Sequence, residues 1–495
     1  MYNSVDKIMI VGGGSAGWMT AATLIKFFPN KNITLIESPN ISTIGVGEST
    51  IGGIRDWVQL LEIDEDDFVK ETDASYKLSI KFTDFYKKGE SFHYPFGEPD
   101  TIGNVNDIND WWFKKFITPN LLHEDYAECY YPQMQLIKTN KFSKKYEYAY
   151  HFDATKFGLW LKNNYCIPRG VKHIQEDIKS IEQNEDGITS LNNKYKADLY
   201  IDCTGFKSML LGQTLLEPFE SFEDMLPNNS AWATKIDYVD KEKELAPYTN
   251  CTAYNNGWIW NIPLRNRIGT GYVYSDKFVS DEEALKEFKQ YLNKQDLEYK
   301  KIKMRVGIHK RLWVKNVCAI GLAAGFIEPL ESNGLFSVHE FLILLLRNMQ
   351  RDEVSQWDKD NFTYQCKTLF TNFAEFVALH YALSHRKDTE YWKNNFNKTW
   401  SDNLINLKPV LQDGFLANAI RRNKEYKYDI RGGYHCIAAG MHYGPTDVVS
   451  ILKNNKVKDI NYWKSEWKNV VSNLDNKKNT WKKEALNNKK LLDFL

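Results

Sequence analysis

Residues 7–17 read KIMIVGGGSAG, an apolar run that ends in a glycine-rich turn. The run predicts a short buried strand, and the apolar residues 18–28 predict the helix that follows it. In such a unit Gly12 permits a tight turn, Gly14 lets the backbone approach a pyrophosphate, and Gly17 allows close packing of helix on strand. The first N–H groups of the helix would face the phosphates. The pattern is typical of a dinucleotide-binding unit.

A second predicted strand, residues 33–36, ends in Glu37, twenty residues beyond Gly17. An acidic side chain at this distance can bond ribose hydroxyls, which favours FAD or NAD over NADP. Strand, helix, glycines and acidic residue are all in register, so an ordinary glycine-rich turn explains the pattern less well. Ser15 and Ala16, inside the turn, belong to the same candidate cofactor site.

Composition and charge indicate a sizeable enzyme. A chain of 495 residues exceeds the usual size of a single core, so we expect two or three packed lobes. Lys plus Arg equals Asp plus Glu at 64 each, which gives no electrostatic reason to expect a nucleic-acid or membrane partner. Residues 341–346 form the most apolar helical run, which is far too short to span a membrane. The first strand begins too early for a signal peptide, so we expect a soluble, cytoplasmic protein.

The seven cysteines are scattered through the chain. None belongs to a C-x-x-C pair or shows the spacing of metal ligands. We therefore expect reduced thiols and no metal site.

The rest of the chain predicts further α/β structure without linkers or repeats. Residues 75–96 are typical of extended segments, and the helical period dominates from about Gly334 onward. Strands are predicted at 199–201, near 231–236 and near 269–274, and a helix from about 281 to 293.

Five further motifs follow in order. They are GVGEST at 45–50, Lys77 within SYKLSIKF at 75–82, DCTGF at 202–206, GWIWNIP at 257–263 and FIEPLESNG at 326–334. Together with the glycine turn they resemble the flavin-dependent halogenases of the tryptophan-halogenase type. In that family the W-x-W-x-I-P element separates halogenases from related flavin monooxygenases. Alone it would indicate a core strand with two tryptophans, but the F-x-x-P-x-x-S-x-G motif at 326–334 favours the halogenase.

The resemblance implies an α/β fold of the FAD-binding, glutathione-reductase or hydroxylase-like kind. It would have an interleaved β-sheet substrate region and a mostly helical C-terminal lobe. On this basis residues 1–345 form the FAD-binding halogenase core, with a substrate-facing insertion at about 75–150. Residues 346–495 form a helical lobe that covers the substrate.

The resemblance also implies the chemistry. Reduced FAD from a separate flavin reductase reacts with O2, halide is oxidised to hypohalous acid, and the acid moves to a lysine. Strand alternation puts Lys77, Ser79 and Lys81 on one face, and only the motif match selects Lys77. A neutral amine would form a haloamine and an ammonium would hydrogen-bond the acid, and both remain open. Glu331 matches a family glutamate that orients the oxidant and takes the proton from the arenium intermediate.

Other roles are carried over in the same way. The remaining cofactor-binding positions are Gly47, Glu48, Ser49, Asp202 and Gly321. The backbone N–H groups of Asn333 and Gly334 would hold the halide, because paired amides in a turn form an anion nest. Family members that chlorinate tryptophan commonly carry Thr where this chain has Asn333. The change favours bromide or iodide over chloride, since both are easier to oxidise and to dehydrate.

Substrate-binding positions follow from the same resemblance. They are His93, Phe96, Ser332, Tyr434 and His435, of which His93 and Phe96 would sandwich an aromatic ring. One extra residue separates His93 from Phe96 relative to the tryptophan enzymes, and His435 replaces one member of a tyrosine pair. These departures favour a small indole, phenol or related heteroaromatic over free tryptophan.

Two other functions stay open at this point, a flavin-dependent aromatic hydroxylase and a non-catalytic flavin-binding protein. The sequence also leaves open whether the chain forms a homo-oligomer.

Overall fold

The computed structural model describes residues 3–40, 48–100, 109–118, 120–351, 353–412, 431–447 and 460–495. The chain forms two compact units, each made of segments that are distant in sequence. The first contains residues 1–75, 150–237 and 264–374, and the second contains residues 76–149, 238–263 and 375–495. This division differs from the ranges 1–345 and 346–495, which stay a prediction.

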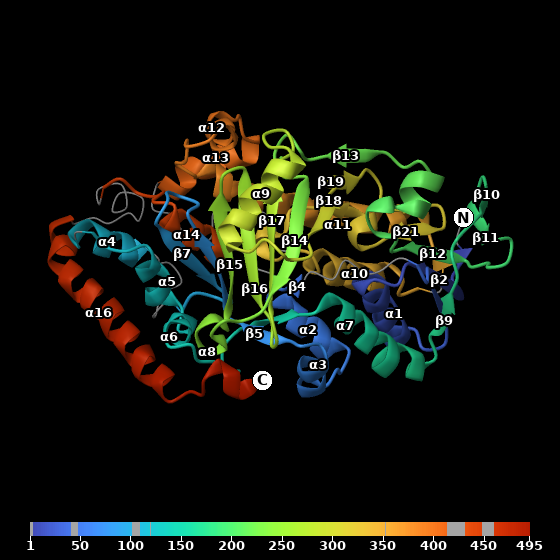
Figure 1. Ribbon diagram of the computed structural model, residues 1–495, viewed down its shortest axis with the longest axis horizontal. Coiled ribbons are helices and arrows are strands. Elements are labelled where there is room, and N and C mark those ends of the chain that lie inside the picture. Colours follow the sequence, from blue (N-terminus) through green and yellow to red (C-terminus); the bar gives the residue numbers. More distant parts are fainter. Residues whose placement is uncertain are drawn as a thin grey trace. The chain divides into compact units, whose positions relative to one another are not determined.

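The first unit is built on a six-stranded sheet (Figure 1). In order across the sheet its strands are β20 (Trp313–Val314), β21 (Val317–Ala319), β12 (Leu199–Asp202), β2 (Lys7–Val11), β3 (Asn32–Glu37) and β9 (Lys172–Gln175). From β21 to β9 all neighbouring strands are parallel, and β20 is antiparallel to β21. Parallel strands are usually covered on both faces, and β12 is accordingly buried along its whole length.

Helix α1 (Ser15–Phe27) connects β2 to β3. It contacts β3, α7 (Ala154–Trp160) and α10 (Phe336–Asn348), and the two helices lie beside it in Figure 1. The predicted strands at 7–11 and 33–36 are confirmed. The helix predicted after the glycine turn is also confirmed, and it begins at Ser15, directly after the extended residue Gly14 and ahead of the apolar run 18–28.

The remaining strands of the first unit pair with one another in the antiparallel direction. Strand β14 (Ser230–Ile236) lies between β17 (Ile268–Tyr274) and β18 (Lys300–Lys303), and β19 (Gly307–His309) lies between β13 (Phe219–Ser221) and β22 (Gly325–Phe326). Three further pairs are β10 (Ile181–Asn184) with β11 (Gly187–Leu191), β1 (Asn3–Ser4) with β23 (Glu353–Val354), and β4 (Glu48–Ser49) with β8 (Ala149–Phe152). Its other helices include α2 (Gly53–Leu60), α3 (Glu65–Glu71) and α9 (Asp281–Leu292), and α11 (Gln356–Ala382) begins in it. The predicted strands near 231–236 and 269–274 and the helix near 281–293 are thereby confirmed.

The second unit contains four neighbouring strands in the order β16 (Gly257–Pro263), β15 (Tyr248–Tyr254), β6 (Ser79–Thr83) and β7 (Ser91–Pro95). β15 is parallel to β6, and the other pairs are antiparallel. The extended segment predicted at 75–96 is divided, because β5 (Ser75–Lys77) and β6 are separated at Leu78 and belong to different sheets.

The other described elements of the second unit are mainly helices. They are α4 (Asn109–Ile117), α5 (Glu124–Tyr130), α6 (Gln133–Lys138), α8 (Lys241–Glu244), α12 (Glu390–Asn397), α13 (Asp402–Gln412), α14 (Arg431–Gly440) and α16 (Ile460–Leu486). Both α5 and α14 pack on β7. The fit is close, because a Cβ added to Gly440 of α14 would lie 2.1 Å from the Phe92 ring on β7.

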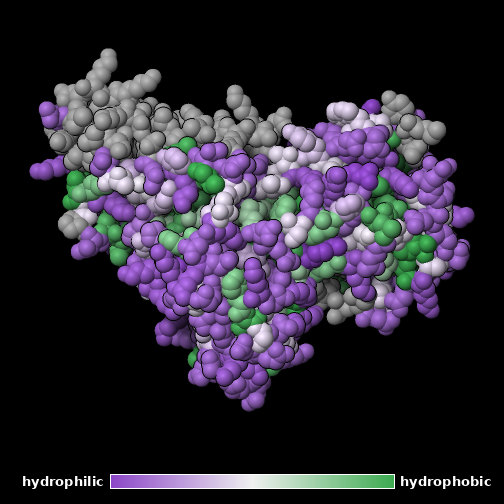
Figure 2. Space-filling model, turned by 90° about the horizontal axis from the view of Figure 1, so that it is seen from above, coloured by the Kyte–Doolittle hydropathy of each residue, from purple (hydrophilic) through white to green (hydrophobic). Residues whose placement is uncertain are grey.

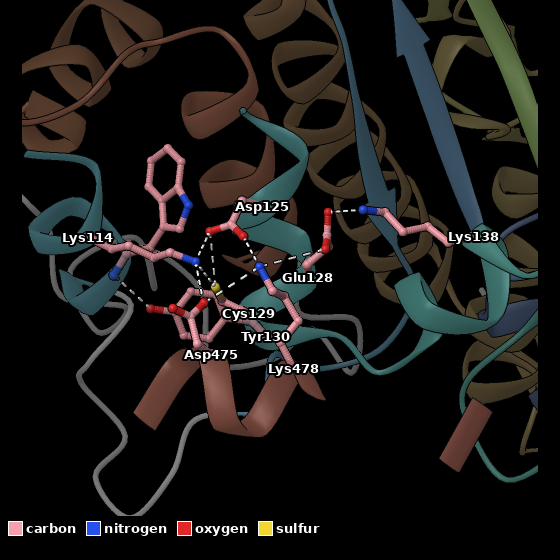
Figure 3. Close-up of polar contacts among 9 residues, drawn as sticks. Lys114, Asp125, Glu128, Cys129, Tyr130, Lys138, Asp475 and Lys478 are labelled. Atoms are coloured by element: carbon pink, nitrogen blue, oxygen red, sulfur yellow. Dashed lines mark hydrogen bonds and ion pairs between the residues drawn. The ribbon is translucent and has the colours of Figure 1, made fainter. Parts of the chain in front are cut away.

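Ion pairs connect the long helix α16 to α4 and α5 (Figure 3). The Lys114 ammonium lies 2.6 Å from the Asp125 carboxylate and 2.9 Å from that of Asp475 on α16. Lys478, also on α16, pairs with Asp125 as well. The Lys114 and Asp125 side chains are 4% and 8% exposed. Loss of one partner would leave an uncompensated buried charge, so the contact is sensitive to single substitutions.

Polar side chains dominate the face seen in Figure 2, where hydrophobic residues form small separate groups. No helix of the described residues is long and apolar enough to cross a bilayer. All seven cysteines are buried.

Candidate active site

The turn between β2 and α1 excludes side chains at two of its glycines. Gly12 has a φ of +113°, and a Cβ there would lie 2.3 Å from the carbonyl oxygen of Cys203, beyond the end of β12. A Cβ on Gly17 would lie 1.9 Å from the carbonyl oxygen of Gly12. Both distances are shorter than any real contact, so the turn can form only with glycine at these two positions.

Gly14 is different, because it faces open space. Its φ of −74° and ψ of −177° are ordinary extended values, and no described atom lies within 4 Å of an added Cβ. Helix α1 begins at the next residue. Among the described residues no side chain caps this helix start, and its first turn carries no acidic residue. The uncapped N–H groups and the helix dipole therefore favour an anion in front of Gly14.

Glu37 lies beside this turn at the end of β3. A Cβ added to Gly13 would lie 1.5 Å from Glu37 Oε2, so the two residues are in direct contact. The other carboxylate oxygen lies 2.7 Å from His173 Nε2 and 3.3 Å from Lys162 Nζ. Sequence reasoning missed these two partners because they are 136 and 125 positions away from Glu37 and form no motif.

Asp202, at the end of β12, is fully buried, and its carboxylate is occupied by its own loop. One oxygen accepts hydrogen bonds from the N–H and hydroxyl groups of Thr204, at 3.0 and 2.6 Å. The other accepts from the N–H groups of Leu210 and Leu211, at 2.8 and 2.9 Å. Asp202 thus shapes the loop next to the glycine turn, and a direct bond to a cofactor stays a prediction.

Gly321 also lies against the turn. Its φ is +70°, and an added Cβ would lie 2.8 Å from the Cβ of Ala16 in the first turn of α1. The structure therefore brings Gly321 and Ala16 together with Gly12, Gly14 and Glu37 in the first unit.

A second group of predicted residues meets in the same unit, at the F-x-x-P-x-x-S-x-G motif. The Ser49 hydroxyl lies 3.0 Å from that of Ser332, and Glu48 Oε2 is 3.6 Å from the place of a Cβ on Gly334. Burial raises the pKa of Glu48 to about 7. The predicted cofactor residue Gly47 lies outside the described residues.

The motif itself folds into a buried turn. The short 3-10 helix Pro329–Glu331 is followed by Ser332, whose φ of 58° is left-handed. Asn333 donates from its side-chain amide to the carbonyl of Ile327, at 3.4 Å. Glu331, Ser332 and Asn333 are almost completely buried. A left-handed serine costs on the order of 1 kcal/mol, and such strain is most often found at functional turns.

Lys77 belongs to the second unit and has no exposed area. Its ammonium nitrogen lies 5.0 Å from the centre of the Phe96 ring. Lys81, the other lysine of this segment, is partly exposed. Strand alternation alone indicated a half-polar face, but the flanking Tyr76 and Leu78 are buried too, so both faces are covered.

His93 is opposite Lys81 in the β6–β7 ladder, and the side chains of directly opposed residues share a face. Its Nδ1 lies 2.9 Å from the Ser79 hydroxyl, and its ring meets the Tyr248 ring edge-on at 5.1 Å. Burial lowers the pKa of His93 to about 3, so the imidazole is neutral at ordinary pH.

Tyr434 and His435 are on α14, which packs on the strand that carries His93. The Tyr434 ring contacts Phe376 at 5.1 Å, and His435 is buried. The predicted substrate residues His93, Phe96, Tyr434 and His435 therefore all belong to the second unit. Glu331 belongs to the first unit, so its convergence with Lys77 stays a prediction.

The parallel sheet, the glycine turn and the acidic residue at the end of the next strand define a nucleotide-binding α/β protein. The family model described as tryptophan halogenase matches residues 7–455. The chain belongs to this family and is a flavin-dependent halogenase, so the predicted fold class and enzyme class are confirmed.

Individual relatives agree with this assignment. The chain is 33% identical to tryptophan 6-halogenase SttH of Streptomyces toxytricini, over 81% of this chain and 82% of the relative. It is 31% identical to tryptophan 7-halogenase RebH of Lentzea aerocolonigenes, over 90% and 91% of the two chains. The solved structure of Xcc4156, a flavin-dependent halogenase from Xanthomonas campestris, has a TM-score of 0.87 at 26% identity and covers 99% of this chain and 98% of its own.

The environment of Gly14 predicts that a substitution there weakens flavin binding without affecting folding. Gly14→Val should fold normally, because its extended backbone suits valine and its Cβ points into open space. It should lose FAD affinity by on the order of a hundredfold or more, because the side chain enters the space of the pyrophosphate. Flavin fluorescence quenching and thermal unfolding measure the two properties.

Gly12→Val is the matched control and should lose stability as well as binding, because its Cβ would overlap the Cys203 carbonyl. A folded Gly14→Val protein with unchanged FAD affinity would disprove the cofactor assignment.

Proposed function

We propose that this enzyme halogenates a small aromatic molecule, an indole, a phenol or a related heteroaromatic, through hypohalous acid held at Lys77. It would use halide, O2 and reduced FAD supplied by a separate flavin reductase. The observation that carries the proposal is the complete burial of Lys77 beside the Phe96 ring. Lysine is rarely buried completely, and at this family position we take the burial of Lys77 as support for a catalytic role.

The residues of the first unit suit FAD. The open space at Gly14, the uncapped start of α1 and the contact of Glu37 with Gly13 match a pyrophosphate and a ribose. Gly321 and the loop shaped by Asp202 lie against the same turn and complete this side of the site. When bound, reduced FAD together with O2 supplies the oxidising equivalents that turn halide into hypohalous acid.

The backbone N–H groups of Asn333 and Gly334 would hold the halide. The neighbouring Glu48 supports this role, because burial raises its pKa to about 7 and so weakens its repulsion of an anion near neutral pH. The turn is buried, so the ion must lose much of its water. Bromide and iodide lose water more easily than chloride, and we propose that they are the preferred halides.

Lys77 would capture the hypohalous acid and keep it from diffusing away. A hydrogen bond from the ammonium, or a covalent haloamine on the neutral amine, would both fix the halogen at the Lys77 nitrogen. The fixed position converts an encounter in solution into a reaction inside one site. It would also decide which ring carbon is attacked.

Glu331 would act as a general base. Attack on the halogen leaves a ring carbon that carries both hydrogen and halogen, and loss of that proton restores aromaticity. A buried carboxylate such as that of Glu331 can orient the acid and accept this proton.

The second unit supplies an aromatic surface for the substrate. The rings of Phe96, the neutral His93, Tyr434 and His435 would contact a planar molecule, as the resemblance to the family implies. Two of the relatives named above, SttH and RebH, are tryptophan halogenases, which supports an indole-like substrate. His435 replaces one member of the tyrosine pair that helps hold the amino acid in the family, which disfavours free tryptophan as the substrate.

Replacing Lys77 tests its role. Lys77→Ala should lower halogenated product by on the order of a hundredfold or more, because the oxidant is no longer held in place. Oxidation of the reduced flavin should continue at its normal rate, since the lysine acts after the oxidant is made. Mass spectrometry of the product, with catalase present and a reductase supplying flavin, measures the change.

Lys81→Ala is the matched control, because this lysine is partly exposed on the neighbouring strand, and it should retain most activity. Full product formation by Lys77→Ala would mean that free hypohalous acid does the chemistry, and the lysine assignment would be wrong.

Glu331→Gln should slow product formation by roughly a hundredfold without moving the halogen to another ring carbon. The amide keeps the size of the side chain but cannot take the proton. Rate and regiochemistry are measured in the same reductase-coupled assay with a single aromatic substrate. An unchanged rate in a correctly folded variant would exclude general-base assistance by Glu331.

A further inference from the structure

Three side chains of the second unit meet around one point, although they come from separate segments of the chain. Glu90 ends the turn between β6 and β7, His123 directly precedes α5, and His442 follows the end of α14. Glu90 Oε2 lies 3.1 Å from His123 Nε2 and 2.9 Å from His442 Nε2. One donor atom from each residue lies within 4.8 Å of both others.

The hydrogen bond of His123 to Ala439 orients its ring so that Nε2 is directed at Glu90. Its Nδ1 lies 3.2 Å from the carbonyl oxygen of Ala439, and a carbonyl can only accept, so Nδ1 carries the hydrogen. The other ring nitrogen, Nε2, faces Glu90 Oε2 at 3.1 Å. A metal ion bound between these two atoms would take the place of the proton that they otherwise share.

The bond from His123 Nδ1 to Ala439 matches the usual surroundings of a histidine ligand. Metal-binding histidines generally donate their second ring N–H to a carbonyl or carboxylate, which fixes the ring and leaves the other nitrogen for the metal. The same bond connects the start of α5 to the last turn of α14, so it also fixes the distance between two of the three segments.

His442 is held in a conformation that its residue type rarely adopts. Its φ is 54°, in the left-handed region where a helix usually ends in Gly or Asn. The Tyr86 ring stacks on its imidazole at 4.2 Å and fixes the direction of the ring.

Two imidazoles and one carboxylate are the ligand set of open zinc sites and suit other imidazole-preferring cations. Magnesium and calcium prefer sets made of oxygen alone. Two ligands on a tetrahedral zinc ion lie roughly 3.3 Å apart, close to the separations of 2.9 and 3.1 Å between Glu90 and the two histidines. The two imidazole ring centres are 3.3 Å apart, so the rings must move apart for both Nε2 atoms to bind one ion. The side chains of Glu90 and His442 are 31% and 30% exposed, so a cation can enter from solvent and keep a water ligand.

We propose that Glu90, His123 and His442 form a binding site for a divalent transition-metal ion of the zinc class. The ion would tie the β6–β7 turn to the ends of α5 and α14. This would stabilise the part of the second unit that carries His93, Tyr434 and His435. The nearby Lys115 and His385 are not part of the ligand set.

Zinc titration of the untagged, full-length protein tests the site after chelator treatment and removal of the chelator. Calorimetry should give one zinc ion per chain, and thermal unfolding should shift upward with zinc but not with magnesium. Glu90→Gln and His442→Asn should each weaken zinc binding at least about tenfold. Asn tolerates the left-handed backbone of His442, so this variant keeps the local fold.

His385→Ala is the matched control, because His385 contacts Tyr86 from outside the three ligands and should bind zinc as the unmodified protein does. If His442→Asn unfolds, the Glu90→Gln result alone decides. Equal zinc affinity in Glu90→Gln and the unmodified protein would overturn the proposal. So would the absence of saturable binding up to about 1 mM zinc.

Discussion

The first unit depends on one backbone contact, the close approach of the glycine turn to the end of β12. Gly12 lies so near the Cys203 carbonyl that any side chain would separate β2 from β12. Gly17 closes the same turn from the other side, against the Gly12 carbonyl. Together they hold the start of α1 at the carboxyl edge of the parallel sheet, where open α/β sheets bind their ligands. The open space at Gly14 can receive a pyrophosphate only because the close contacts of Gly12 and Gly17 hold the start of α1 at this edge of the sheet.

A second constraint is the number of polar groups that the enzyme keeps away from water. Lys77, Glu331 and Ser332 are almost completely buried, and Glu48 is buried enough to raise its pKa to about 7. Burying such groups costs free energy, and apolar residues of the same size would be more stable at these positions. Perturbed and buried ionisable groups are typical of catalytic sites, which agrees with the family of this chain.

Local patterns in the sequence predicted the nucleotide-binding unit well, because its rules act over short distances. An apolar run, a glycine turn and an acidic residue placed β2, α1 and β3 to within a few residues. The burial of Lys77 could not be read from its strand, since alternation shows a polar face but not what covers it. The cluster of Glu90, His123 and His442 could not be predicted from the sequence for a similar reason. Its members are far apart in sequence and have no motif spacing, and the sequence indicated no metal site.

The central claim is that this chain places a halogen on a small aromatic ring. Its most direct test is incubation of the enzyme with FAD, a flavin reductase, NADH and equal concentrations of chloride, bromide and iodide. Mass spectrometry of a panel of indoles and phenols then identifies the products. We predict products in which halogen replaces hydrogen, with bromide or iodide incorporated in preference to chloride. Products that gain oxygen at the same rate with and without halide would contradict the claim and identify a hydroxylase.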